Sequence, residues 1–225
     1  MARIAENLAE VKGRIAQAAR RSGRTPEDVT LVVVTKKVEV SRILEAISAG
    51  ATELGENYVQ EAVAKWQAIG SAGVRWHFIG HLQKNKVKQA VKVFDLIQSV
   101  DSLPLAQEIG KRALDQGRIM DVLIEVRISG EETKHGVSPE DALAFAQEVA
   151  QVEGIKLQGF MGMAPFVVNP EEARPFFARL KQLWDKLPLE QRQWLSMGMS
   201  HDFEVAIEEG SNMVRIGTAI LGPRS

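Results

Sequence analysis

The stretch Thr30-Leu31-Val32-Val33-Val34-Thr35-Lys36-Lys37 is a run of β-branched and aliphatic residues that ends at two lysines. An apolar run without alternation predicts a strand that is buried on both faces, as in a parallel sheet. A lysine at the C-terminal end of such a strand is costly to bury without a partner. It is either the solvated end of the strand or an amine that points into a pocket and forms a Schiff base with an aldehyde cofactor.

The composition is that of a globular protein with one large core. The 225 residues are 45% hydrophobic and 25% charged, and residues 1–225 are expected to form a single domain. The net charge of −1 gives no global field that would favour nucleic acid or anionic membranes. The absence of cysteine excludes disulfides, thiolate metal sites and a cysteine nucleophile. With no signal core and no membrane-spanning apolar run, a cytoplasmic location is expected.

Helices and strands are predicted to alternate along the chain. Residues 2 to 21 form a first helix, because the apolar residues Ile4, Leu8, Val11 and Ile15 make one stripe. The predicted strands cover residues 30–36, 51–54, 74–79, 94–99, 120–128, 155–160, 194–197 and 213–216. The predicted helices that follow them cover residues 40–49, 56–69, 83–92, 103–116, 138–152, 170–187 and 202–209.

This alternation predicts an α/β protein with right-handed crossovers and a parallel sheet. Eight short strand–helix units favour a single closed (β/α)8 TIM barrel with an extra N-terminal helix. A doubly wound open sheet is the alternative, since a strand count from one sequence can be off by one or two.

The C-terminal ends of barrel strands carry functional groups, and here they are mostly polar or small. The last two strands run into Ser196-Met197-Gly198-Met199-Ser200 and Val214-Arg215-Ile216-Gly217-Thr218. Loops in these positions commonly bind phosphate, since glycine lets backbone N–H groups approach an anion. The simpler interpretation is that Gly198 and Gly217 only permit tight turns.

Closure of the barrel would bring the first strand beside the eighth. Lys36, a phosphate-binding loop and Arg215 would then surround one flat phosphorylated aldehyde, which describes pyridoxal 5'-phosphate (PLP). Successive strand residues alternate faces, so only one of Lys36 and Lys37 can point inward. We choose Lys36, although alternation alone does not say which.

Several segments resemble the pyridoxal phosphate homeostasis protein family, which is similar to the N-terminal barrel of alanine racemase. They are His77-Phe78-Ile79-Gly80-His81-Leu82-Gln83-Lys84-Asn85-Lys86, Leu54-Gly55-Glu56-Asn57, Ser196-Met197-Gly198-Met199-Ser200-His201-Asp202 and Ala206-Ile207-Glu208-Glu209-Gly210 running into Val214-Arg215-Ile216-Gly217. The resemblance implies a single-domain barrel that binds PLP covalently, has no well-established turnover and acts in the balance of vitamin B6 and amino-acid pools.

The resemblance also implies roles for individual residues. Lys36 matches the Schiff-base lysine and Arg215 the residue that faces the pyridine nitrogen. Ser200 matches the hydroxyl that faces the phosphate, Gly217 and Thr218 match its backbone donors, and Asn57 lies in the pocket. The sequence departs from the family pattern at Lys37, where the second lysine has moved, at Arg127 instead of asparagine, and at Asn212 instead of threonine.

We therefore expect a PLP carrier in vitamin B6 homeostasis, with PLP-dependent apoenzymes as partners and with no catalytic residues or metal. The rival is a racemase-like PLP-dependent amino-acid enzyme, which needs a second base. The candidates for that base are Tyr58, Lys37, His81 and His201. A phosphate-binding barrel enzyme without PLP is a further alternative. A nucleic-acid site at Lys84-Asn85-Lys86-Val87-Lys88 is disfavoured against a solvated helix face. A monomer is expected, because the racemase's second domain is missing.

Overall fold

The computed structural model describes residues 2–70, 73–130 and 135–222 and shows a closed barrel. The strands are β1 (Thr30–Val34), β2 (Glu53–Glu56), β3 (Arg75–Phe78), β4 (Leu96–Val100), β5 (Met120–Val126), β6 (Ile155–Gly162), β7 (Trp194–Ser196) and β8 (Met213–Ile216). All neighbouring strands are parallel, and β8 pairs with β1 to close the sheet. The predicted α/β class and (β/α)8 barrel are confirmed, and the open sheet is wrong.

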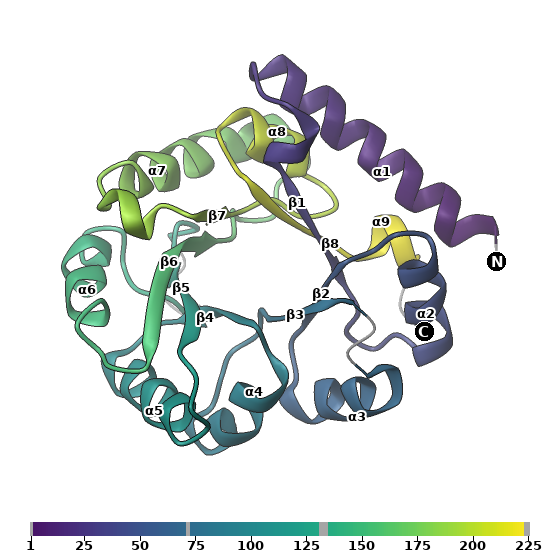
Figure 1. The fold of residues 1–225 in the computed structure, drawn as a ribbon. Coiled ribbons are helices and arrows are strands. Elements are labelled where there is room, and N and C mark those ends of the chain that lie inside the picture. The colour runs from purple at the N-terminus through teal and green to yellow at the C-terminus, as the bar shows by residue number, and fades with distance from the viewer. Residues whose placement is uncertain (1, 71–72, 131–134, 223–225) are drawn as a thin grey trace.

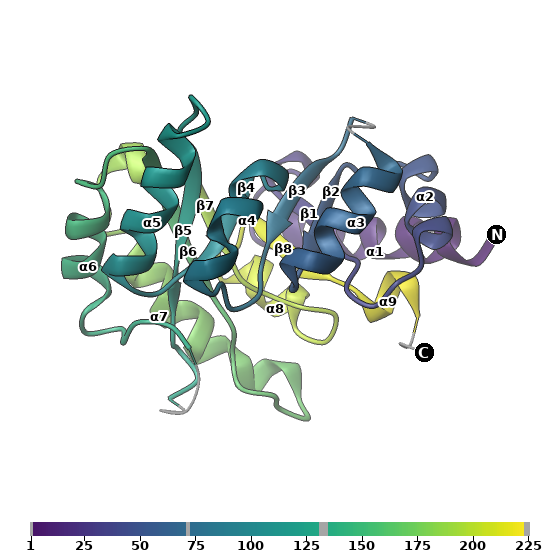
Figure 2. The same ribbon diagram turned by 90° about the horizontal axis from the view of Figure 1, so that it is seen from below.

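Helices surround the barrel in chain order (Figure 1). They are α1 (Ala2–Arg21), α2 (Val40–Ser48), α3 (Val59–Ile69), α4 (Val87–Val93), α5 (Leu103–Leu114), α6 (Ala142–Val149), α7 (Arg174–Trp184), α8 (Phe203–Glu208) and α9 (Thr218–Leu221). The extra helix α1 packs on the outside, against α8 and α9. Figure 2 gives the side view, with α3, α4 and α5 in front of the strands. Short 3₁₀ turns are η1 (Pro26–Asp28), η2 (Lys84–Lys86), η3 (Pro170–Ala173) and η4 (Leu189–Gln191).

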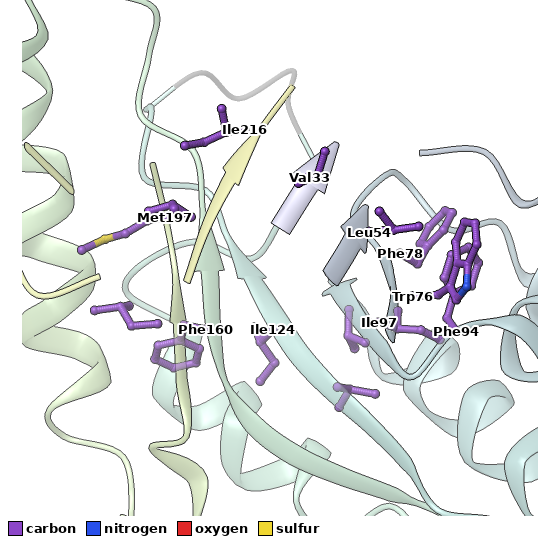
Figure 3. Packing of buried hydrophobic residues seen from close by; sticks show 14 of the residues in the cluster. Val33, Leu54, Trp76, Phe78, Phe94, Ile97, Ile124, Phe160, Met197 and Ile216 are labelled. Carbon is purple, nitrogen blue, oxygen red and sulfur yellow. The ribbon is translucent and has the colours of Figure 1, made fainter. Parts of the chain in front are cut away.

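Two layers of apolar side chains fill the structure. The inner cluster joins Val32, Leu96, Leu123, Met161 and Met213, which come from strands on all sides of the barrel. The outer cluster lies between the strands and the helices and forms the larger core (Figure 3). Consecutive residues of β1 divide between the two layers, because Val32 belongs to the inner cluster and Val33 to the outer one.

Some predicted boundaries are wrong. The first strand ends at Val34 rather than at Lys36, and residues 35–39 form a turn and connection. The second strand was expected at 51–54 but covers Glu53–Glu56, because pairing with β1 aligns Val32 with Glu53 and extends the ladder through Gly55. The helix expected at 138–152 covers only Ala142–Val149, since Ser138 and Asp141 bond each other in a turn that precedes it.

Candidate cofactor-binding site

Lys36 lies in the turn after β1, and the two residues beside it are fixed by one buried cation. Lys65 of α3 donates from Nζ to the Thr35 carbonyl at 2.6 Å, to Glu56 Oε1 at 2.7 Å and to Glu61 Oε1 at 2.5 Å. Glu61 in turn accepts the Lys37 backbone N–H at 2.5 Å. Lys65 is 5% exposed and Glu56 is fully buried. This cluster holds the backbone on both sides of Lys36.

The two candidate lysines differ in their surroundings. Lys36 is half-buried, whereas Lys37 is exposed and has a φ of 57°. The Thr35 hydroxyl points to the outer side, where it donates to Glu56 Oε1 at 2.6 Å. Val34 lies on the inner side with Val32, since a Cβ added at Gly55 would meet side-chain atoms of both.

The loops after β7 and β8 meet at the predicted phosphate-binding residues. The Thr218 hydroxyl donates to Ser200 Oγ at 3.2 Å, and the Ala219 N–H lies 3.5 Å from the same oxygen. A Cβ added at Gly217 would lie 3.3 Å from the Val34 carbonyl oxygen, so this loop lies against the end of β1. The structure therefore places Ser200, Gly217 and Thr218 together, beside the strand that leads to Lys36.

Arg215 is a second buried cation at this end of the barrel. Its Nη1 donates to Ser196 Oγ at 2.6 Å and its Nη2 to the Gly162 carbonyl at 3.1 Å. Burial lowers the pKa of Arg215 to about 10, and the nearby charges of Glu125 and Asp202 oppose this shift. The guanidinium remains protonated near neutral pH, so it can only donate hydrogen bonds.

Two buried carboxyl groups accompany Arg215. Burial and the charge of Asp101 raise the pKa of Glu125 to about 7, against the opposing effect of Arg215. Burial also raises the pKa of Asp202, whose Oδ1 accepts the Met199 N–H at 2.7 Å and shapes the loop after β7.

Asn57 follows β2 at the same end of the barrel. Its Oδ1 is buried and has no hydrogen-bond partner among the described residues. A buried amide atom without a partner is costly, and a bound polar group would relieve that cost. The Ser200–Thr218 hydroxyls fit a phosphate group, and Asn57 Oδ1 is an unpartnered acceptor that fits a hydrogen-bond donor on the same ligand.

The remaining candidates lie on the surface or lack metal-binding geometry. Tyr58, Lys37, His81 and His201 are all exposed. Ligand atoms of His81, Asp101 and His135 lie within 4.8 Å of one another. The two imidazoles are stacked at 3.7 Å with an interplanar angle of 12°, so their in-plane lone pairs run parallel and do not converge on one ion.

Sequence reasoning missed the cluster of Lys65, Glu56 and Glu61. The i, i+4 spacing of Glu61 and Lys65 was a usable signal for part of it.

Of the positions that depart from the family pattern, Arg127 is half-buried, and Asn212 bridges β7 and β8 with its side chain. Over the described part of the chain, none of the helices combines the length and the hydropathy needed to cross a bilayer.

Comparisons with known proteins give a consistent result. The model of the alanine racemase N-terminal domain family matches residues 5–225. A pyridoxal phosphate homeostasis protein of Aquifex aeolicus is 44% identical over 225 residues, which cover 97% of each chain. The protein of the same name from Escherichia coli K12 is 42% identical and covers 98% of this chain and 97% of its own.

Among solved structures, PipY of Synechococcus elongatus PCC7942 with PLP bound is 34% identical, with a TM-score of 0.81. The match covers 97% of this chain and all of PipY. The resemblance noted from the sequence motifs is confirmed. With identities above 40% to curated relatives over nearly the whole length, the chain belongs to the pyridoxal phosphate homeostasis protein family, which shares the alanine racemase N-terminal domain.

Proposed function

We propose that this chain holds pyridoxal 5'-phosphate as a Schiff base on Lys36 and acts as a carrier in vitamin B6 and amino-acid homeostasis, with PLP-dependent apoenzymes as recipients. The observation that carries the proposal is the contact between the loops after β7 and β8, beside the end of β1. Bound PLP supplies an aldehyde that reacts with an amine and a ring that accepts electrons.

The phosphate would be held by short-range donors. Ser200 and Thr218 present hydroxyls 3.2 Å apart, and the Gly217–Thr218 segment presents backbone N–H groups at the start of α9. Lys65, which is buried behind the turn, fixes the backbone and so limits the positions open to the Lys36 amine. Asn57 Oδ1 adds a polar atom that is available to a ligand.

Arg215 disfavours carbanion chemistry, although racemases of this type tolerate such an arginine. A protonated guanidinium beside the pyridine nitrogen would not give up its proton, so the ring nitrogen would stay unprotonated and the ring would be a weaker electron sink. The candidate second bases Tyr58, Lys37, His81 and His201 are all exposed, so none of the four is enclosed with the lysine in a buried site.

Borohydride reduction followed by peptide mass analysis tests the covalent site. A pyridoxyl group is expected on Lys36 in the wild-type protein and absent from Lys36→Ala, which should also be colourless after incubation with PLP. Lys37→Ala is the matched control and should keep the label. A label on Lys37 or on surface lysines alone would contradict the assignment.

Incubation of the PLP-loaded protein with L-alanine or L-serine separates the carrier from a racemase. Retained optical purity over many hours is expected, because none of the four candidate second bases is buried in the site. Rapid loss of optical purity that disappears in Lys36→Ala would reject the carrier proposal.

A further inference from the structure

A chain of hydrogen bonds crosses the inside of the barrel and ends at Arg215. Arg215 Nη1 donates to Ser196 Oγ at 2.6 Å, and Ser196 Oγ donates to Gln98 Oε1 at 2.6 Å. Gln98 Nε2 lies 2.9 Å from His77 Nδ1, and His77 Nε2 lies 2.5 Å from Glu53 Oε2. These five residues, on β8, β7, β4, β3 and β2, form what we call the barrel relay.

The direction of every bond in the barrel relay follows from Arg215 at one end and from the orientation of the Gln98 amide, whose Oε1 faces Ser196 and whose Nε2 faces His77. Arginine has no acceptor, so the Ser196 proton is free to point at Gln98 Oε1. The Gln98 amide nitrogen must then donate, and His77 Nδ1 must accept. Gln98 Nε2 also donates to Met213 Sδ, with 3.2 Å between the nitrogen and the sulfur. His77 therefore carries its proton on Nε2 and donates it to the Glu53 carboxylate.

The polar side chains of the barrel relay are buried, which costs desolvation free energy. Gln98 and Ser196 are fully buried, and His77 is 1% exposed. Neighbouring inward positions, such as Leu96 and Leu123, are filled by apolar side chains at no desolvation cost. Each donor in the barrel relay bonds the acceptor of the next residue. Rotation of any one side chain would therefore leave a buried polar atom without a hydrogen bond, so the network holds every side chain in one orientation.

We propose that Glu53, His77 and Gln98 are positioning residues for Arg215: the barrel relay fixes the guanidinium against the cofactor's ring nitrogen and keeps that nitrogen unprotonated. This inference rests on the proposed function, since it assigns Arg215 to the ring of bound PLP. Glu53, the first residue of β2, has a side chain that is 16% exposed and carries the negative charge at the end of the relay away from Arg215.

The first test needs no cofactor. Nitrogen-15 NMR of labelled histidines in the cofactor-free protein should show one ring protonated at Nε2, with Nδ1 as an acceptor, and this signal should be absent from His77→Gln. A His77 signal with the proton on Nδ1 would overturn the relay, since Gln98 could then not donate to it.

The second test reads the ring nitrogen directly, in protein loaded with nitrogen-15 PLP and titrated across neutral pH. The wild type should keep the ring nitrogen unprotonated, whereas Gln98→Leu and His77→Leu should shift its resonance toward that of Arg215→Gln. His77→Gln, which retains an acceptor and a donor, should restore the wild-type resonance. Gln158→Leu is the matched control, because Gln158 is also buried on a barrel strand but contacts Asp121 at 3.3 Å.

The outcomes separate the two proposals. If Arg215→Gln shifts the ring resonance while folded Gln98→Leu and His77→Leu leave it unchanged, the relay is overturned and the proposed function stands. If the wild type gives no protein-bound ring signal at all, the proposed function fails, and the positioning role fails with it. Unfolding midpoints, measured in parallel, identify the variants that fold.

Discussion

At the scale of single residues, Lys65 helps to hold the backbone on both sides of Lys36. Its Nζ donates to the carboxylates of Glu56 and Glu61 and to the main-chain carbonyl of Thr35, at 2.5 to 2.7 Å, and the side chain is buried. Burial raises the pKa of Glu56, and the bonds from Lys65 and Thr35 oppose that shift. Glu56 Oε2 has no partner among the described residues, so the carboxylate is held through Oε1, by the cation of Lys65 and the hydroxyl of Thr35.

Replacement of that cation should be costly. Lys65→Met leaves Glu56 as an uncompensated buried charge, and we expect a loss of about 3 kcal/mol in the free energy of unfolding. Urea unfolding measures it, with Lys88→Met on the exposed face of α4 as a control that should change little. The double variant Lys65→Met, Glu56→Gln should recover part of the loss. Equal effects of the two lysine changes would contradict this role.

Glu125 should make stability depend on pH. Its pKa is raised from 4.5 to about 7 by burial first and then by Asp101. Between these values the unfolded chain is ionised while the folded chain keeps the proton, so the folded state loses stability as pH rises through this window. Each pKa unit is worth about 1.4 kcal/mol, so the loss amounts to about 3 kcal/mol by pH 8.

The Glu125→Gln variant should lack this loss. Its free energy of unfolding relative to wild type is expected to rise between pH 5 and pH 8, as measured by urea unfolding of the cofactor-free protein at both pH values. Glu27→Gln, at an exposed position, is the control. A constant difference between wild type and Glu125→Gln at the two pH values would rule out the raised pKa.

At the scale of elements, the loop between β7 and α8 is held in one shape by close packing. Gly198 has a φ of +100°, and a Cβ there would lie 2.7 Å from Ala206 Cβ and 2.9 Å from Phe203 Cα. The Gly198 carbonyl accepts a hydrogen bond from the backbone N–H of Arg215 at 3.0 Å, so the same loop is bonded to β8. The shape of this loop sets where Ser200 meets Thr218.

A side chain at Gly198 should therefore disturb both stability and binding. Gly198→Ala is expected to cost about 2 kcal/mol and to weaken PLP binding, because the loop must move away from α8. Thermal unfolding and a PLP titration measure the two effects. In Gly13→Ala on α1 the new Cβ meets nothing within 4 Å, so that control should be stabilised by up to about 1 kcal/mol. Wild-type binding by Gly198→Ala would show that the loop adapts.

Much of this element order could be predicted from the sequence, since apolar runs and helix stripes report local burial. Boundaries failed where tertiary pairing decided them. Gly55 and Glu56 have low strand propensity, yet pairing with β1 draws them into β2. Ser138 has the features of a helix start, but its hydroxyl bonds Asp141 and delays the helix to Ala142. The single-domain expectation for residues 1–225 stays a prediction.

At the scale of the whole molecule, the site depends on which strands the barrel brings together. Lys36, Ser200 and Arg215 could be picked from the sequence because strand ends are recognisable and their motifs resemble a known family; their roles toward PLP stay predictions. The barrel relay could not be picked, since His77, Gln98 and Ser196 lie within three separate strands and no local pattern links them. Only closure of the sheet makes them neighbours.

The closed barrel also requires the pairing of β7 with β8, which we call the β7–β8 seam. This seam is short, with Ser196 and Met213 as its register pair. Asn212 lengthens this seam, because its Oδ1 accepts the Leu195 N–H at 2.7 Å and its Nδ2 donates to the Gln193 carbonyl at 2.8 Å. The side-chain amide thus replaces a missing stretch of strand. The two strands that lead to Ser200 and Thr218 are held together partly by one residue.

Asn212→Ala should consequently open this seam before the rest of the barrel. We expect a loss of about 1 to 2 kcal/mol in stability, with faster amide hydrogen exchange in β7 and β8 and unchanged exchange in β4 and β5, whose pairing is far more extensive. Hydrogen–deuterium exchange with mass spectrometry resolves these segments. Asn169→Ala, which removes a cap bond to the Glu171 N–H at 3.2 Å, is a control that should leave β7 and β8 unaffected. Exchange that rises equally in all strands would mean that the barrel opens as one unit and that Asn212 has no special place in its closure.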